Sequence, residues 1–283
     1  MHFTYYIIFK IFKKIVVLLY YFKYNVISGG ICLRIQFKGE INMKKKVLAL
    51  LGASLVLSLT LGLGTTNTPK TKNISTLETH SIPVSNLSKE ESALKMKELY
   101  EYQKQVQRYG ARSSTINVNV DVAADQYFTS TYGSTAWKSK AATYVSQGNT
   151  PIKSWFGITY VINSYKTWTA GTSDDSTVRY TEMNQKVFGS SPLLIGFSGN
   201  EAIGDNGNAV GGEAGVGSDS LIVFDQADDY SNIVSLAHES GHSYNLSHCN
   251  SNCLMNAGTA AYQYFHNLCA PHTTQWNSQK NRY

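Results

Sequence analysis

Residues 238–248 contain three histidines and a glutamate at a spacing that suits a catalytic zinc ion. His238 and His242 are four positions apart, so on a helix their imidazoles lie on one face, one turn apart. Glu239 projects about 100° around that helix, beside the metal, where it can hold a zinc-bound water and take its proton. His248 adds a third nitrogen ligand. Three neutral ligands and an open position are typical of a catalytic zinc site.

The third histidine requires a turn in the chain. It comes six residues after His242, and a helix continuing that far would carry it past the metal. Asn245 stands where the turn is needed, and Asn is one of the few residues besides Gly that tolerate left-handed backbone geometry at a helix end. We therefore expect a helix over 231–244, followed by a turn at Asn245 that returns His248 to the other two histidines.

This segment resembles the metzincin metallopeptidases, whose signature is HExxHxxGxxH followed by a methionine turn. Asn245 replaces the usual Gly, and Met255 is the turn methionine. The resemblance covers about 230–256 and implies a zinc endopeptidase with Glu239 as general base, then general acid. It also implies that Met255 packs beneath the imidazoles without binding the metal, and that 256–264 line the primed-side pocket. Ala257 stands where astacin- and serralysin-like members carry a tyrosine.

Two other functions use the same residues. A secreted, zinc-stabilised binding module would bind the metal without turnover. Glu239 argues against it, because a purely structural site gains nothing from a base. A toxin-like peptidase with one host target would share the chemistry, and only substrate data separate it from a general protease.

Three cysteines follow the histidines, an odd number in a chain expected to be secreted. The order of Cys249, Cys253 and Cys269 resembles that of the archaemetzincins, in which four cysteines hold a second, structural zinc. His266 takes the place of one of them, so the resemblance implies a second zinc site of three cysteines and His266. One disulfide with a free thiol is the alternative. His272 is the alternative ligand to His266 at this second zinc site, and if it does not bind the metal we expect it to be a surface histidine.

The charge of the chain is unevenly distributed over its 283 residues, although the net value is +6. Residues 1–112 carry 17 Lys and Arg against 6 Asp and Glu, a net charge of +11, whereas 113–283 carry 8 against 13, a net charge of −5. The acidic part is long enough for one well-buried core and offers no basic surface for nucleic acid. We expect a monomer without a stable membrane anchor, whose partner is a protein or peptide substrate.

Residues 43–64 are typical of a secretory signal peptide. Met43 begins a basic start, an apolar run covers 47–61, and the small residues Gly62 and Gly64 stand at the two cleavage-determining positions, which predicts cleavage after Gly64. A membrane-anchoring helix is the alternative, because a run of about 18 residues borders the span length. Residues 1–42 do not fit in front of a signal. We expect them to be an untranslated upstream extension and the protein to be secreted by a Gram-positive bacterium.

Residues 65–112 are expected to be a propeptide or linker. Their first part, to Ser88, is rich in Thr, Ser and Asn with two prolines and indicates a linker. Ser88 then offers a helix start, and an imperfect apolar stripe follows up to Gly110. A short helix here could cover the active-site cleft before processing, and a charged spacer is the alternative. No Cys lies between 65 and 248, which excludes a cysteine-switch latch like that of matrix metalloproteinases.

Strands alternate with helices in 113–283, the expected catalytic domain, and predict a mixed α/β sheet of the metzincin-like, zincin (α+β) type with a small C-terminal subdomain. The expected strands are 116–122, 157–162, 193–197 and 220–224, and the expected helices are 134–147, 174–188 and 231–244. The Gly-rich segment 211–216 matches the place of the antiparallel edge strand on which metzincins bind an extended substrate. A flexible glycine loop is the alternative.

Overall fold

The computed structural model describes residues 25–27, 30–32, 78–109 and 115–283. The expected upstream extension lies largely, and the expected signal peptide wholly, outside these residues. The chain divides into two units, Met1–Thr71 and Lys72–Tyr283. In the first, β1 (Asn25–Ile27) and β2 (Gly30–Cys32) form an antiparallel pair. Within the described part of the chain, no helix combines the length and apolar character needed to cross a membrane.

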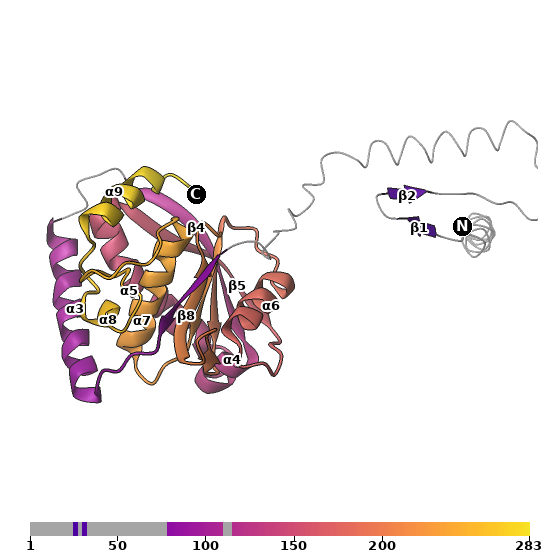
Figure 1. The fold of residues 1–283 in the computed structure, drawn as a ribbon, viewed down its shortest axis with the longest axis horizontal. Coiled ribbons are helices and arrows are strands. Elements are labelled where there is room, and N and C mark those ends of the chain that lie inside the picture. Colours follow the sequence, from indigo (N-terminus) through magenta and orange to yellow (C-terminus); the bar gives the residue numbers. More distant parts are fainter. Residues whose placement is uncertain (1–24, 28–29, 33–77, 110–114) are drawn as a thin grey trace, which may run out of the picture. The chain divides into compact units, whose positions relative to one another are not determined.

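The second unit is built on a seven-stranded mixed sheet (Figure 1). The strand order is β3-β8-β9-β6-β4-β5, and β7 pairs with β8 beside this path. The strands are β3 (Thr79–Pro83), β4 (Ile116–Asp125), β5 (Ile158–Trp168), β6 (Leu193–Ser198), β7 (Ala202–Ile203), β8 (Ala209–Gly215) and β9 (Ser220–Phe224). The predicted mixed α/β class is confirmed, and each of the four predicted strands falls in a strand of this sheet.

One half of the sheet is parallel. β4 pairs in parallel with β5 and β6, and β6 pairs in parallel with β9. Parallel neighbours need a crossover connection, which α5 (Ala136–Phe156) and α6 (Ser176–Lys186) supply among β4, β5 and β6, whereas β7 and β8 lie between β6 and β9 in the chain. Both of these helices were predicted, but α5 runs past the expected end at 147. Its second half is buried against the sheet, and this burial outweighs the helix-breaking tendency of Pro151.

The two faces of the sheet carry separate apolar clusters, so the central strands are buried on both sides. Along β9, Leu221 and Val223 belong to a cluster that includes residues of α5 and α7 (Asp229–Ser243), whereas Ile222 and Phe224 belong to one that includes residues of α6. Figure 1 shows α6 on the opposite side of the sheet from α5 and α7. The histidine-bearing helix therefore lies in the layer that contains the larger cluster.

The other half of the sheet is antiparallel and differs from the prediction. β8 pairs antiparallel with β9, as expected for the substrate-binding strand. It is not an edge strand, however, because β3 pairs antiparallel with its outer side, from Thr79 opposite Gly215 to Pro83 opposite Val210. Residues 79–83 of the expected linker therefore form a strand, whereas 65–77 lie outside the described residues. The strand character of 79–83 comes from the hydrogen-bonding groups that β8 offers, and not from their own composition.

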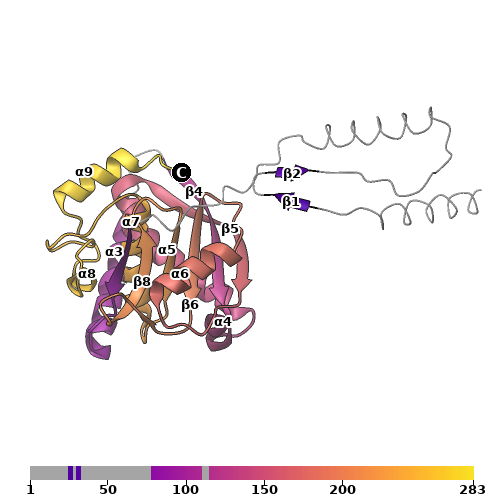
Figure 2. The ribbon, with the colours of Figure 1, turned by 45° about the vertical axis from the view of Figure 1, so that its right-hand side comes forward.

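The helix predicted after the linker is confirmed as α3 (Lys89–Tyr109). A reciprocal capping box begins it: the backbone N–H of Ser88 donates to Glu91 Oε2 at 2.8 Å, and the backbone N–H of Glu91 donates to Ser88 Oγ at 3.2 Å. Three helices were not predicted, namely α4 (Gln126–Tyr132), α8 (Ala260–Gln263) and α9 (Ala270–Gln279). α3, α8 and α9 lie at the same end of this unit, away from β5 and α4 (Figures 1 and 2).

Candidate metal centres

Helix α7 ends in the turn that the sequence predicts. The backbone N–H of Leu246 donates to Gly241 O at 3.0 Å, and that of Asn245 donates to His242 O at 2.8 Å, which is a Schellman motif. Asn245 has φ 68° and is the single non-glycine residue with positive φ in the described ranges. The left-handed residue reverses the chain directly after the helix and returns it toward the metal-binding face.

The three histidines of the motif converge on one point. The Nε2 atoms of His238, His242 and His248 form a triangle in which all three separations are 3.1 Å. A tetrahedral zinc ion with Zn–N bonds of about 2.0–2.1 Å separates its nitrogen ligands by about 3.3 Å. The side chains present therefore fit one zinc ion, with three nitrogens on one side of it.

Backbone carbonyls orient two of these rings. His238 Nδ1 donates to Leu254 O and His242 Nδ1 donates to Leu246 O, both at 2.7 Å. A carbonyl can only accept, so Nδ1 must carry the proton and Nε2 must present its lone pair to the metal. Leu246 belongs to the Schellman turn, so the turn that returns His248 also orients His242.

The histidines are also held in the neutral form that metal binding requires. Burial, together with the neighbouring His248, lowers the pKa of His238 to about 3. Burial likewise lowers the pKa of His248 to about 4 and that of His242 well below its usual value. At neutral pH all three rings are therefore uncharged.

Glu239 is fully buried beside the histidines. Within the described part of the chain, neither carboxyl oxygen of Glu239 has a hydrogen-bond partner at a normal distance and angle. Burial and the nearby Glu213 raise its pKa well above the usual value, and the approaching backbone of Ile82 lowers it by less. A Cβ on Gly212 would lie 2.8 Å from Glu239 Cγ, so the glycine lets β8 approach this side chain. Glu239 thus has the free carboxyl that a general base needs.

Met255 packs against α7, as the resemblance implies. It is fully buried, and a Cβ on Gly241 would lie 2.3 Å from its Sδ. The backbone N–H of Cys249 donates to Met255 O at 2.9 Å. The methionine turn is therefore tied to the residue that directly follows the third histidine.

The cysteines form a second group next to the first. One ligand atom each of Cys249, Cys253, Cys269 and His272 lies within 4.8 Å of all the others. His272 Nδ1 is 3.2 Å from Cys269 Sγ and 3.5 Å from Cys253 Sγ. None of these three cysteines is in a disulfide. Four closely placed donors of this type fit a tetrahedral structural zinc.

His272 stands in this group in place of the predicted His266. His266 is exposed, and its ring lies 5.8 Å from that of Tyr102 on α3. His272 is only 6% exposed, so it is not the surface histidine expected of it. Cys269 is the N-cap of α9, and helical spacing brings a residue three positions later to the same side. Pro271, in the first turn of α9, is the sequence feature from which the start of that helix could have been predicted.

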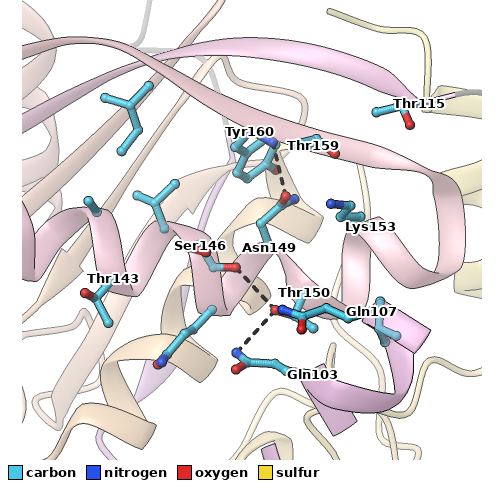
Figure 3. A pocket seen from close by; sticks show the side chains of 15 residues that line it. Gln103, Gln107, Thr115, Thr143, Ser146, Asn149, Thr150, Lys153, Thr159 and Tyr160 are labelled. Carbon is cyan, nitrogen blue, oxygen red and sulfur yellow. Dashed lines mark hydrogen bonds between the residues drawn. The ribbon is translucent and has the colours of Figure 1, made fainter. Parts of the chain in front are cut away.

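A cavity of about 790 Å³ lies between α3, α5 and β5 (Figure 3). Asn149 projects into it but is already engaged, because its Nδ2 donates to Ile158 O at 3.2 Å and its Oδ1 accepts from the Tyr160 N–H at 3.1 Å. The described lining contains one cation, Lys153, and no His, Cys, Asp or Glu. This cavity thus offers no metal-binding or nucleophilic set, and it leaves α3 in incomplete contact with the layer beneath.

Neither a protein-family model nor a curated protein matches this chain. Among solved structures, an archaemetzincin from Methanopyrus kandleri is similar at 14% identity, with a TM-score of 0.46, over 59% of this chain and 97% of that chain. An archaemetzincin from Archaeoglobus fulgidus complexed with malonate has 15% identity and a TM-score of 0.39, over 56% and 99%. A chaperone–substrate complex has 15% identity and a TM-score of 0.40, over 59% and 34%. These similarities are too weak to assign a function, which must come from the site itself.

Proposed function

We propose that the chain is a secreted zinc metalloendopeptidase. The observation that carries the proposal is the triangle of three Nε2 atoms, 3.1 Å apart, next to a buried carboxyl without a full hydrogen-bond partner. Three ligands leave part of the coordination sphere free for water and substrate. A base adjacent to that open side has a use in hydrolysis and none in a purely structural site.

The residues divide the chemistry among themselves. His238, His242 and His248 would hold the zinc ion, which when bound supplies Lewis acidity that polarises a peptide carbonyl and lowers the pKa of water. Glu239 accepts the proton of the attacking water and then donates it to the departing amine. The backbone of β8 has the orientation to pair with an extended peptide.

We further propose that the cysteine group holds a second, structural zinc ion through Cys249, Cys253, Cys269 and His272. Four ligands close the coordination sphere, and no base lies among them. This assignment gives the odd number of cysteines a use without a disulfide. The ion would fix the segment that carries Met255 and the position of His248, the direct neighbour of Cys249.

The test is Glu239→Gln in the full chain, assayed for zinc content and for cleavage of casein. We expect zinc content equal to that of the wild type and a loss of turnover of about 10³-fold, near the middle of the range for general acid–base catalysis. Glu90→Gln, at an exposed position on α3, is the matched control. Cleavage by Glu239→Gln at the wild-type rate would contradict the mechanism. Zinc binding without cleavage of any peptide by the wild type would favour a binding module.

A further inference from the structure

The strand β3 lies where an extended peptide would pair with β8. Its ladder runs antiparallel from Thr79 to Pro83, and beyond it the backbone N–H of Val84 donates to Ala209 O at 3.1 Å. This is the main-chain pairing by which a peptide adds to a sheet. The hydrogen-bonding groups on the outer side of β8 are therefore already in use by the chain itself.

The same segment also makes hydrogen bonds outside this ladder. The hydroxyl of Tyr262 donates to Pro83 O at 2.8 Å, and the backbone N–H of Ser85 donates to Gln226 Oε1 at 2.8 Å. Tyr262 belongs to α8, in the segment after the methionine turn that was expected to line the substrate pocket. The backbone of Ile82 approaches the carboxyl of Glu239. The segment thus contacts β8, α8 and the proposed general base.

Alternation along β3 places one side chain at the metal-binding histidines. His80 and Ile82 share one face, and Ser81 lies on the other, opposite Glu213 in register. His80 Nδ1 is 3.1 Å from His248 Nδ1, and the ring centroids of His80 and His242 are 5.0 Å apart. Among the histidines of the described residues, His80 is the one N-terminal to the catalytic part, and it contacts this centre.

We propose that residues 78–85 are a pseudosubstrate, an extended peptide of the chain's own that fills the substrate groove and is fastened at the metal centre by His80. This inference rests on the proposed function, since it takes the groove over Glu239 to be the substrate site. The substrate class that follows is an extended peptide bound as a strand along β8. The active enzyme must first displace this segment.

The attachment of the flanking helix agrees with a removable segment. α3 is held by polar contacts such as that of Ser92 Oγ with Asp228 Oδ1, and the cavity of about 790 Å³ interrupts its contact with α5. Leu99 is its deeply buried apolar anchor. Ile82 and Leu99 belong to the larger apolar cluster, so departure of the segment uncovers part of that cluster.

The test uses the zinc-loaded full chain as wild type, His80→Ala and the control Ser81→Ala, whose side chain lies on the other face of β3. The probe is the tripeptide hydroxamate Pro-Leu-Gly-NHOH, with its Kd measured by calorimetry and zinc content and casein cleavage measured on the same samples. We expect His80→Ala to lower the Kd by about ten-fold, because a larger fraction of molecules has an open groove. Ser81→Ala should stay within about two-fold of the wild type.

If His80 has a different role, His80→Ala should change the Kd of the hydroxamate in the opposite direction. If His80 serves only to orient His248, then His80→Ala lowers zinc content or weakens hydroxamate binding, and either result overturns the pseudosubstrate. Tighter binding by His80→Ala with no casein cleavage by any variant would support the pseudosubstrate and contradict the endopeptidase. Equal binding and equal cleavage by wild type and His80→Ala would support the endopeptidase and overturn the pseudosubstrate.

Hydrogen exchange on the wild type tests the same inference without a variant. The amides of 79–82 should exchange slowly in the zinc-loaded chain. Saturation with the hydroxamate should speed their exchange while the amides of β8 stay protected, because the probe replaces β3 on the same strand. Unchanged exchange of β3 at saturation would overturn the proposal.

Discussion

The two candidate metal centres are adjacent in the chain yet differ in what surrounds their ligands. His248 ends the first group and Cys249 begins the second. The histidine group has three converging nitrogens, rings oriented by carbonyls, and Glu239 with a free carboxyl. The cysteine group has four donors within 4.8 Å of one another and no acidic member. Ligand number and an available base therefore separate a site fit for hydrolysis from one fit for stability.

The two groups also differ in how the fold assembles them. The three histidines span eleven residues, and one helix with its C-terminal turn is enough to bring them together. The cysteine group takes its donors from 249, 253, 269 and 272, and needs the chain to fold back through α8 to α9. Local geometry controls the first centre, and tertiary packing controls the second.

The largest expected effect separates the two metal ions. His272→Ala should reduce the zinc content from two ions to one and lower the free energy of unfolding by several kcal/mol, because structural zinc binding is coupled to folding. His266→Ala is the matched control and should keep both ions, since His266 is exposed and outside the group. Metal analysis with chemical denaturation measures both. Loss of zinc in His266→Ala, with none in His272→Ala, would contradict the ligand assignment.

The next variant perturbs the histidine centre through its packing. Gly241→Ala should cost about 1–3 kcal/mol of stability, because the added Cβ would lie 2.3 Å from the buried Met255 Sδ. Activity should fall with it, since Gly241 lies between two of the ligands on α7. Gly133→Ala is the control, because a Cβ there meets no atom within 4 Å, although its φ of 88° adds backbone strain. Thermal unfolding and casein cleavage would show whether the centre depends on this contact.

A smaller effect is expected at the turn. Asn245→Gly should retain zinc and activity, because Gly adopts left-handed geometry without cost. Asn245→Val should cost about 1–2 kcal/mol, since a β-branched residue is strained at φ 68°. Its catalytic zinc should be held more weakly, and the cysteine group should keep its own ion. Equal zinc affinity in the two variants would show that the turn does not position His248.

The smallest predicted effect is a pH dependence at the start of the histidine-bearing helix. Burial raises the pKa of Asp225 to about 6, despite hydrogen bonds from Tyr132 and Asn232. An unfolded Asp titrates near pH 3.9, so between about pH 4 and 6 the folded state holds the extra proton. The free energy of unfolding should therefore fall as pH rises through this window, by about 1 kcal/mol after solvent screening.

Asp225→Asn tests this pH dependence, because it should remove that decline. Urea unfolding at several pH values would measure it. A decline of the same size in the variant would assign the effect to another group.

Much of the parallel half of the sheet follows from the sequence. β9 matches its prediction at both ends, because a run of five buried residues suits only a strand covered on both faces. The strand β3 could not be found in this way. Among its five residues only Ile82 is a buried apolar residue, and its conformation depends on β8, more than 120 residues further along the chain.

The sequence by itself determined the histidine centre, because helical periodicity and one left-handed residue act over a few neighbouring positions. Asn245 at that turn and Gly241 next to Met255 also act within this short stretch of the chain. Only the tertiary structure decided that His272 joins the cysteines and that β3 pairs with β8. Both depend on contacts between segments that are distant in the sequence. Backbone hydrogen bonds between strands can form with almost any residues, so the sequence of one strand does not identify the strand with which it pairs.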